Sequence, residues 1–192
     1  MAKIVVKSKV KKVKRKFPVE TKAPEYLNSV SLGKSNVTDL NSLIGKTAKI
    51  NLMYINKNPR SQNVRLVFKI IEVNSGLAKT QVVSYTQIPY YLGRYVKKGS
   101  DLIDDSFVVT TKDKIEVRIK PFIVTKNNVS SLILTSIRNE SKVLIEKDIS
   151  KKTYDEFMSS VIGGKIQNSY RNDLKKIVPL KAFEFKKVEM VL

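Results

Sequence analysis

The order in which two hydrophobic patterns follow each other is the feature of this sequence that most limits its fold. Between residues 45 and 125 the apolar residues come in short runs or alternate with polar ones, as in β-strands. From residue 130 to 178 they recur with helical spacing, and residues 180–191 return to a strand pattern. Strands that are grouped before helices favour an antiparallel α+β fold over a doubly wound one. We therefore predict a mostly antiparallel β-barrel or strongly curved sheet, with two or three helices in the C-terminal half and a returning C-terminal strand.

Local signals place the elements within this outline. The segment KIEVRIKPFIV gives the clearest strand pattern, because Ile115, Val117 and Ile119 alternate with charged residues. A capping box begins at Thr153, and Gly163-Gly164 interrupts the helical pattern that follows it. Strands are predicted at residues 47–55, 64–73, 77–85, 107–111 and 114–124, a short helical turn at 38–45, and a helix at 88–99 that lies across the sheet.

The N-terminal segment has a different character. KSKVKKVKRK, residues 7–16, holds seven basic residues and no acid, and residues 1–22 hold nine basic residues and one acid, Glu20. So few large apolar side chains cannot form a core, and like charges would destabilise an isolated helix. We therefore predict that residues 1–24 form an extended basic arm that becomes ordered on a partner, and that residues 25–192 form a single α+β domain.

The charge of the whole chain points to the class of that partner. The net charge is +20, from 37 Lys and Arg against 17 Asp and Glu, and the residues after the first 22 still carry +12. A field of this sign attracts polyanions, and a basic body with a basic arm suits a protein that lies against a large anionic surface. Nucleic acid is therefore the expected partner.

Other functions are limited by what the sequence lacks. It contains no Cys and no His, which excludes disulfides, thiolate zinc sites, Cys nucleophiles and imidazole bases. We expect no catalytic residue, no metal and no cofactor. No apolar run approaches the roughly 20 residues that span a bilayer, so we expect a soluble, intracellular protein without a membrane partner.

Three groups of side chains have both a functional and a structural interpretation. Asp101, Asp104 and Asp105 could hold Mg²⁺ in a nuclease, although in so basic a protein carboxylates more often pair with Lys or cap a turn. Tyr90, Tyr91 and Tyr95 could stack on bases, although tyrosines at helical spacing more often pack against each other. Gly45-Lys46-Thr47 lacks the preceding Gly of a phosphate-binding loop and comes before a strand, so we do not interpret it as one.

Several motifs, taken in order, resemble a known family. KKGSDLID followed by VTTKDKIEVRIKP, from Lys97 to Pro121, is similar to the archaeal and eukaryotic small-subunit ribosomal protein family eS1, also called S3Ae. The resemblance extends over about residues 1–192. The other matching segments are Ala23-Pro24, Leu43-Ile44-Gly45-Lys46, FKIIEV at 68–73, Ile137-Arg138, Gly164-Lys165 and KKIVPL at 175–180.

The resemblance implies a β-barrel with attached helices on the platform of the small ribosomal subunit, near the 3′ end of its rRNA and the exit path of mRNA. It implies a cytoplasmic structural constituent of translation without catalytic activity, whose partners are small-subunit rRNA, neighbouring ribosomal proteins and mRNA near the exit site. Our hypothesis is that the arm, the loop between the strands predicted at 47–55 and 64–73, and the end of the helix predicted at 88–99 contact rRNA phosphates. The residues are Lys3, Lys7, Lys9, Lys11, Lys12, Lys14, Arg15, Lys16, Lys57, Arg60, Arg94, Lys97 and Lys98.

Two departures from the family pattern bear on RNA contacts. Ile88-Pro89-Tyr90 stands where the family has a charged run, and Asn127, Asn128, Ser130 and Ser131 stand where it has several basic residues. From the residues themselves, a free-standing RNA-binding protein, a Mg²⁺-dependent nuclease and a protein-binding scaffold remain alternatives.

Overall fold

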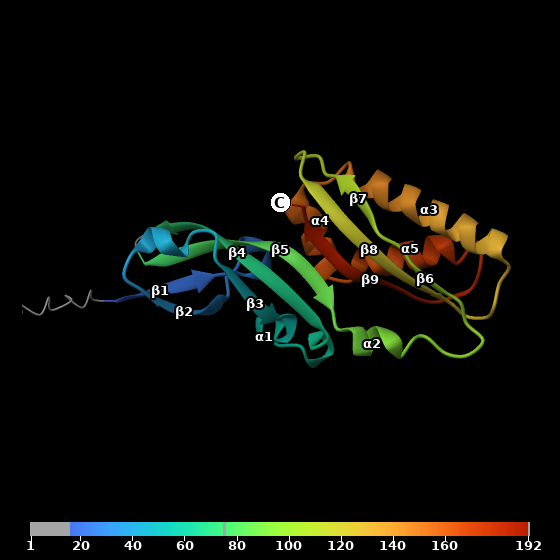
Figure 1. Ribbon diagram of the computed structural model, residues 1–192, viewed down its shortest axis with the longest axis horizontal. Helices are drawn as coiled ribbons and strands as arrows, with labels where there is room; N and C mark the ends of the chain where they lie inside the picture. The colour runs from blue at the N-terminus through green and yellow to red at the C-terminus, as the bar shows by residue number, and fades with distance from the viewer. Residues whose placement is uncertain (1–15, 75, 192) are drawn as a thin grey trace, which may run out of the picture.

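The computed structural model describes residues 16–74 and 76–191 (Figure 1). In this part of the chain, a mixed nine-stranded sheet and five α-helices form an α+β fold. The strands are β1 (Phe17–Lys22), β2 (Ser31–Val37), β3 (Thr47–Asn51), β4 (Val64–Asn74), β5 (Leu77–Gln87), β6 (Leu102–Asp104), β7 (Phe107–Thr110), β8 (Glu116–Thr125) and β9 (Leu180–Met190). The helices are α1 (Leu52–Asn56), α2 (Pro89–Gly93), α3 (Ser131–Ile149), α4 (Tyr154–Ile162) and α5 (Lys165–Leu174), with short 3-10 turns η1 (Glu25–Leu27), η2 (Leu40–Leu43) and η3 (Pro59–Ser61).

Strand β5 joins the two parts of the sheet. One of its edges pairs with β4 in an antiparallel hairpin that runs from Val64 opposite Gln87 to Asn74 opposite Leu77. Its other edge is shared, because β1 pairs with the first residues of β5 in parallel and β9 pairs with residues 84–86 in antiparallel orientation. Strand β9 continues the sheet to β8, which in turn pairs with β6 and β7. The predicted returning C-terminal strand is therefore confirmed.

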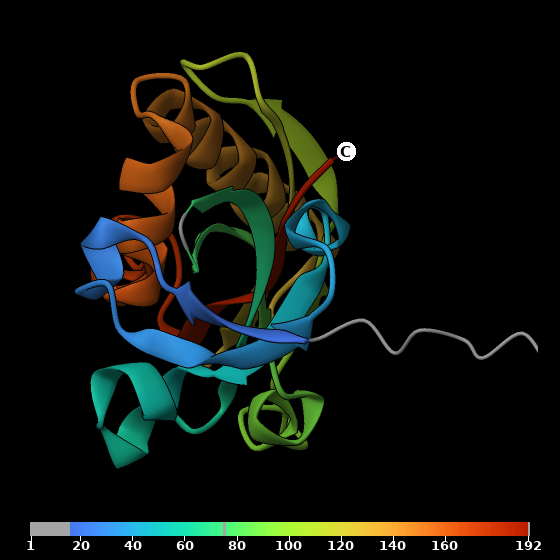
Figure 2. The same ribbon diagram turned by 90° about the vertical axis from the view of Figure 1, so that its left-hand side faces the viewer.

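The sheet does not close, so the predicted barrel is not confirmed, and the pairing is mixed because β1 and β5 are parallel. Figure 2 shows the strands bending around a common centre. Within the described residues, β2 pairs only with β1, β3 only with β4, and β6 and β7 only with β8. These strands are edges, and closure would require two of them to pair with each other.

The predicted arm is wrong for residues 17–22, which form strand β1. Val19 is fully buried and packs with Leu43, Ile70 and Ala78 in a small hydrophobic cluster. The alternation of Val19 and Thr21 with Glu20 and Lys22 was the signal for a strand, but the neighbouring lysines obscured it. The arm residues Lys3 to Arg15 lie outside the described part of the chain, so their role stays a prediction.

The helices of the C-terminal half cover one part of the sheet. Helix α5 packs on β9, α3 contacts β7, and α4 contacts η1. Aromatic rings fill the space between α4, α5 and β9: the centroids of Phe183 and Phe185 are 5.7 Å apart, and those of Tyr170 and Phe183 are 5.5 Å apart. Three helices in this half agree with the prediction. No helix of the described residues is long and apolar enough to cross a membrane.

The helix signals in the sequence were accurate where capping residues marked them. The Thr153 side chain accepts from the backbone N–H of Glu156, whose carboxylate accepts from the Thr153 N–H, so the predicted capping box is present. Helix α4 ends at Ile162, directly before Gly163-Gly164, and Gly164 has a φ of +72°, which favours glycine. The predicted turn at residues 38–45 corresponds to η2.

Two elements differ from the prediction near the middle of the chain. The strand predicted at residues 47–55 stops at Asn51, whose side chain accepts from the Met53 N–H at 2.9 Å and begins α1. The helix predicted at residues 88–99 is shorter, because α2 ends at Gly93 and the chain continues in turns to Gly99. Both differences follow from local hydrogen bonds that apolar periodicity does not reveal.

Candidate nucleic-acid interface

Acidic residues are unevenly distributed along the folded chain. Residues 40–100 contain ten Lys and Arg but a single acid, Glu72, whereas residues 101–192 contain 17 Lys and Arg and 13 acids. A cation can be paired only where a carboxylate is in reach. The first of these segments should therefore leave a larger share of its cations free for an anionic partner.

One group of unpaired cations surrounds a surface pocket of about 530 Å³, which we call the basic pocket. Its cationic residues come from the loop after α2, the end of β8, helix α5 and the start of β9. They are Lys97, Lys98, Lys126, Arg171, Lys175 and Lys181. Among the described residues, none of these six has a carboxylate within 4.0 Å. Cations gathered in a concave site repel each other until an anion binds, so the pocket favours phosphate.

Backbone contacts hold the walls of the basic pocket in place. The Lys181 Nζ donates to the Tyr95 carbonyl at 2.7 Å, and Arg171 Nη2 donates to the Leu180 carbonyl at 3.4 Å. The Lys126 N–H donates to the Pro179 carbonyl at 2.9 Å. These contacts join four separate segments, so the pocket exists only in the folded protein.

Of the predicted phosphate contacts that lie in residues 16–74 and 76–191, the structure brings two, Lys97 and Lys98, into this pocket. Sequence reasoning missed Lys126, Arg171, Lys175 and Lys181, which lie 28 to 84 positions further along the chain. The signal for Lys175 and Lys181 was that the segment KKIVPLK, residues 175–181, contains no acid. These four residues lie close together because β8 pairs with β9 and α5 packs on β9.

The other predicted contacts in the described part of the chain lie outside this pocket. Lys57 is the residue directly after α1 and has a φ of +51°. Arg60 lies in η3, and its N–H donates to the Asn58 side chain at 3.1 Å. The Arg94 guanidinium lies over the Tyr91 ring, 5.6 Å from its centroid. Lys16 is exposed directly before β1. All four side chains are at the surface, but none of them lines the basic pocket.

The three tyrosines around α2 have different roles. The hydroxyl groups of Tyr91 and Tyr95 are 2.8 Å apart, and their rings meet edge to face with centroids 5.5 Å apart. Both rings pack on a small cluster formed by Leu92, Phe122 and Val124. Tyr91 and Tyr95 are therefore packing residues, as their spacing had suggested, whereas Tyr90 is 86% exposed.

A half-buried carboxylate, that of Glu184, interacts electrostatically with Arg171 of the basic pocket. Glu184 on β9 accepts from Gln87 Nε2 at 2.8 Å. Burial raises the pKa of the Glu184 carboxyl above its ordinary value, while the Gln87 hydrogen bond and the positive charge of Arg171 act in the opposite direction. Arg171 thus interacts with Glu184 at long range without forming an ion pair with it.

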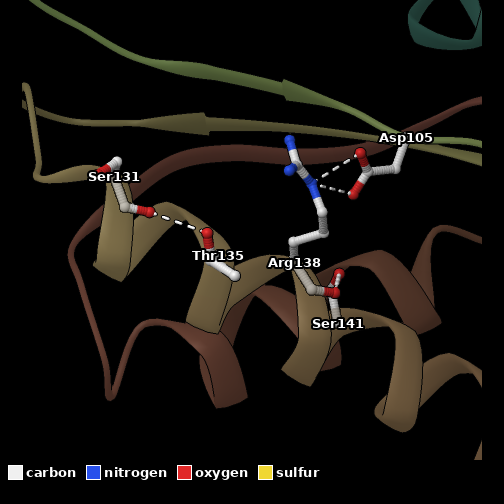
Figure 3. A network of polar contacts seen from close by, with 5 residues as sticks. All are labelled: Asp105, Ser131, Thr135, Arg138 and Ser141. Atoms are coloured by element: carbon white, nitrogen blue, oxygen red, sulfur yellow. Dashed lines mark hydrogen bonds and ion pairs between the residues drawn. The ribbon is translucent and has the colours of Figure 1, made fainter.

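The acidic cluster is engaged in structural contacts. Asp101 accepts from the Val129 N–H at 2.7 Å, Asp104 pairs with Lys186, and Asp105 pairs with Arg138 of α3 at 2.9 Å. Figure 3 shows the last pair, together with the Thr135 and Ser141 hydroxyls that donate to carbonyls of their own helix. The three carboxylates therefore point to different partners rather than to a common metal ion. This arrangement supports the interpretation that they pair with cations and cap turns.

The Gly45-Lys46-Thr47 segment does not form a phosphate-binding loop. Gly45 has a φ of +84° and donates its N–H to the Ile70 carbonyl at 2.9 Å, and Thr47 begins strand β3. A phosphate-binding loop would lead into a helix whose N–H groups face the anion. The order of elements here is the reverse.

An α+β domain with a basic pocket and this many unpaired surface cations has the features of a nucleic-acid-binding protein. Comparison with known proteins narrows the class. The chain belongs to the Ribosomal S3Ae family, whose model matches residues 5–192. The resemblance seen in the sequence is therefore confirmed.

Relatives from several archaea are all named small ribosomal subunit protein eS1. The chain is 29% identical to the small ribosomal subunit protein eS1 of Nanoarchaeum equitans, over 86% of this chain and 84% of the relative. It is 28% identical to the protein of that name from Haloarcula marismortui, over 95% of this chain and 85% of the relative. It is 29% identical to that of Saccharolobus islandicus, over 88% of this chain and 81% of the relative.

Proposed function

We propose that this protein is a structural constituent of the small ribosomal subunit, with a role in translation and no catalytic activity. The observation that carries the proposal is the basic pocket, where six cations from distant segments meet without a carboxylate partner among the described residues. Membership of the Ribosomal S3Ae family and the names of the archaeal relatives support it. A ribosomal protein acts in the ribosome, so its location would be cytoplasmic.

The proposed mechanism is electrostatic. Phosphates of folded rRNA would enter the basic pocket and release their condensed counterions, and the shape of the pocket would fix the position of the RNA backbone. Base recognition would be secondary, because sequence-specific RNA recognition needs bases that are unpaired and accessible. The arm cations, Lys3 to Lys16, would extend this contact along further phosphates.

The position within the subunit follows from the resemblance. We propose a place on the platform, near the 3′ end of the rRNA and the path of mRNA, with ribosomal proteins as neighbours. The uncharged residues at 88–90 and at 127, 128, 130 and 131 lie in segments where the family pattern is charged. Phosphate contacts should therefore shift from these segments to the basic pocket and to Arg94.

Sedimentation tests the proposal directly. Cells that express the tagged full-length chain are lysed, and the extract is separated on a sucrose gradient with and without high salt. The chain should travel with the small subunit and should cross-link to rRNA under ultraviolet light. Recovery only at the top of the gradient would contradict a ribosomal role and would favour a free-standing RNA-binding protein or a scaffold.

Substitutions in the pocket test the site. The triple variant Lys126→Gln, Arg171→Gln and Lys175→Gln should reduce the slope of log affinity for rRNA against log salt by roughly 0.7 to 0.9 for each phosphate that it no longer neutralises. The matched control is Lys142→Gln with Lys176→Gln, because Lys142 and Lys176 already pair with Glu146 and Asp173. Equal slopes for the two variants would show that the pocket does not contact RNA.

The arm can be tested in the same way. Removing residues 1–16 should flatten the salt slope by about 0.7 to 0.9 for each phosphate that the arm neutralises in the full-length chain. An unchanged slope would mean that the arm does not contact RNA, whatever the result for the pocket.

A further inference from the structure

Two tyrosines outside the basic pocket expose their rings to solvent. Tyr54 on α1 is 70% exposed and Tyr90 on α2 is 86% exposed. Neither hydroxyl has a hydrogen-bond partner among the described residues, in contrast to Tyr91 and Tyr95, which bond to each other. An exposed aromatic ring on an ordered element has a face available for stacking.

The two helices that carry these rings are joined by hydrogen bonds. The Asn51 side chain that caps α1 also donates through Nδ2 to the Gln62 carbonyl at 2.7 Å, just after η3. The next residue, Asn63, accepts from the Ile88 N–H at 2.9 Å, directly before α2. In Figures 1 and 2, α1 and α2 protrude from the same side of the molecule. We call this surface, formed by residues 51–63 and 88–98, the α1–α2 ridge.

The charge of the ridge has one sign. Its two segments contain five cations, Lys57, Arg60, Arg94, Lys97 and Lys98, and no acid. None of these five has a carboxylate within 4.0 Å in the described part of the chain. Lys97 and Lys98 also line the basic pocket, so the ridge and the pocket form a continuous cationic surface.

We propose that the α1–α2 ridge binds unpaired RNA, with bases stacked on Tyr54 and Tyr90 and with phosphates beside Lys57, Arg60 and Arg94. The proposal rests on the proposed function and adds a kind of RNA structure to it. Aromatic rings interleaved with cations are the arrangement by which proteins hold single strands, because every base has a face that can stack. The bases of a duplex are already stacked on each other, so exposed rings contribute little to its binding.

The charge of the ridge favours RNA over a protein partner. Tyrosine and arginine are also common in protein interfaces, but such interfaces need an apolar centre and matching charges of both signs. Besides the two tyrosines, the ridge exposes one large apolar side chain by more than a third, Val96 at 40%. A surface with five cations and no acid suits a polyanion.

Binding to short RNA distinguishes these possibilities. The full-length chain and its variants are titrated with a labelled 12-nucleotide single-stranded RNA and with a duplex of the same length, at several salt concentrations. Tyr54→Ala and Tyr90→Ala should each weaken single-strand binding by about fivefold to about 150-fold, with an unchanged salt slope because no charge is removed. Binding of the duplex should change much less.

Matched variants separate stacking from other effects. Tyr54→Phe and Tyr90→Phe keep an aromatic face and should bind the single strand like the parent chain. Leu132→Ala removes an apolar side chain that is 79% exposed on α3, away from the ridge, and should also have no effect. Lys57→Gln with Arg60→Gln should reduce the single-strand salt slope by roughly 0.7 for each phosphate that the variant no longer neutralises.

The proposal is overturned if the two alanine variants bind the single strand as tightly as the parent, or if single strand and duplex weaken equally. It is also overturned if the alanine variants fail to join the small subunit while their binding to RNA is unchanged, since the ridge would then bind a protein. Circular dichroism melting of each variant identifies any loss of folding. A chain that shows the tyrosine effect but does not sediment with the small subunit would contradict the proposed function and leave the ridge supported.

Discussion

Residues 40–100 and residues 101–192 use their charges in opposite ways. The second segment forms most of the ion pairs of the described residues, among them Arg138 with Asp105 and Lys152 with Asp148. The first segment forms one, Lys79 with Glu72 at 3.9 Å, and both of these side chains are more than half exposed. The number of cations is not the difference, because the second segment has more of them. What differs is how many carboxylates are in reach.

The comparison extends to aromatic side chains. In the second segment Tyr154, Phe157, Tyr170 and Phe185 are buried between helices and sheet. In the first segment Tyr54 and Tyr90 have exposed rings. Phe68 and Tyr85 of the first segment are buried in the same core. The difference is that the second segment contributes the helices that cover this core, whereas the first leaves a larger share of its cations unpaired and carries the two exposed tyrosine rings. Substitution of a buried aromatic residue of the second segment should therefore lower stability, whereas substitution of an exposed tyrosine of the first segment should affect binding.

The largest expected effect is in the core of the second segment. Phe185→Ala should lower the free energy of unfolding by about 3 to 5 kcal/mol, because Phe185 is fully buried and the aromatic cluster around it cannot collapse into the cavity. Chemical denaturation with urea measures the change. Val143→Ala on α3, at an exposed position, is the control and should change stability by no more than about 0.5 kcal/mol. Similar losses in both variants would contradict this assignment of the core.

A smaller effect is expected where the two segments meet. The Tyr154 hydroxyl of α4 donates to the Val82 carbonyl of β5 at 2.8 Å, between the residues of β5 that pair with β1 and those that pair with β9. Tyr154→Phe should cost about 1 to 2 kcal/mol of stability, because a buried carbonyl loses its donor while the ring still packs. Thermal unfolding followed by circular dichroism checks this. A neutral result would mean that water replaces the hydroxyl.

Two arginines, one from each segment, test the comparison most directly. Arg138→Gln breaks a pair with Asp105 and should cost about 0.2 to 1 kcal/mol of stability, less at high salt. Arg94→Gln breaks no ion pair and should change stability by no more than about 0.5 kcal/mol, while weakening RNA binding. Urea titrations and RNA binding are measured on both variants. If Arg138→Gln weakened RNA binding more than Arg94→Gln, the division of roles would be wrong.

The smallest effect concerns Glu184, a half-buried acid of the second segment, and it depends on pH. Burial raises the pKa of Glu184 in the folded protein, so the folded state binds this proton more tightly than the unfolded state does. Stability from this group is therefore present below its ordinary pKa of 4.5 and is lost as pH rises through the higher folded value. Glu184→Gln should be more stable than the parent at pH 7, and the difference should disappear near pH 4.

The matching control for this experiment is Glu140→Gln, at an exposed position on α3. It should show no stability gain at pH 7. A gain for Glu184→Gln that persists unchanged at pH 4 would show that burial of the charge is not its cause.

The sequence predicted most of the fold where the signal was local. Alternation identified β4, β5, β7 and β8, and the capping box at Thr153 together with Gly163-Gly164 identified the bounds of α4. It failed for β1, where lysines obscured a short alternation, and for α1, where one Asn51 hydrogen bond ends the strand. It could not decide whether the sheet closes, because closure depends on pairing between distant edges.

The site was predictable only in part for the same reason. Lys97 and Lys98 were identified from a run of adjacent cations, but Arg171, Lys175 and Lys181 join them only because α5 and β9 fold back beside the loop after α2. In the sequence, Tyr90, Tyr91 and Tyr95 formed a single motif. Their packing separated Tyr91 and Tyr95 from Tyr90.

The amino-acid sequence by itself determined the excess of positive charge, the absence of Cys and His, the order of strands before helices, and the family. These properties are sums or local patterns, and folding does not change them. Tertiary structure alone decided which cations keep a carboxylate partner and which remain free, which rings are buried, and where the sheet ends. The physical reason is that an ion pair or a stacking face depends on distances of a few ångströms between residues that are far apart in the chain.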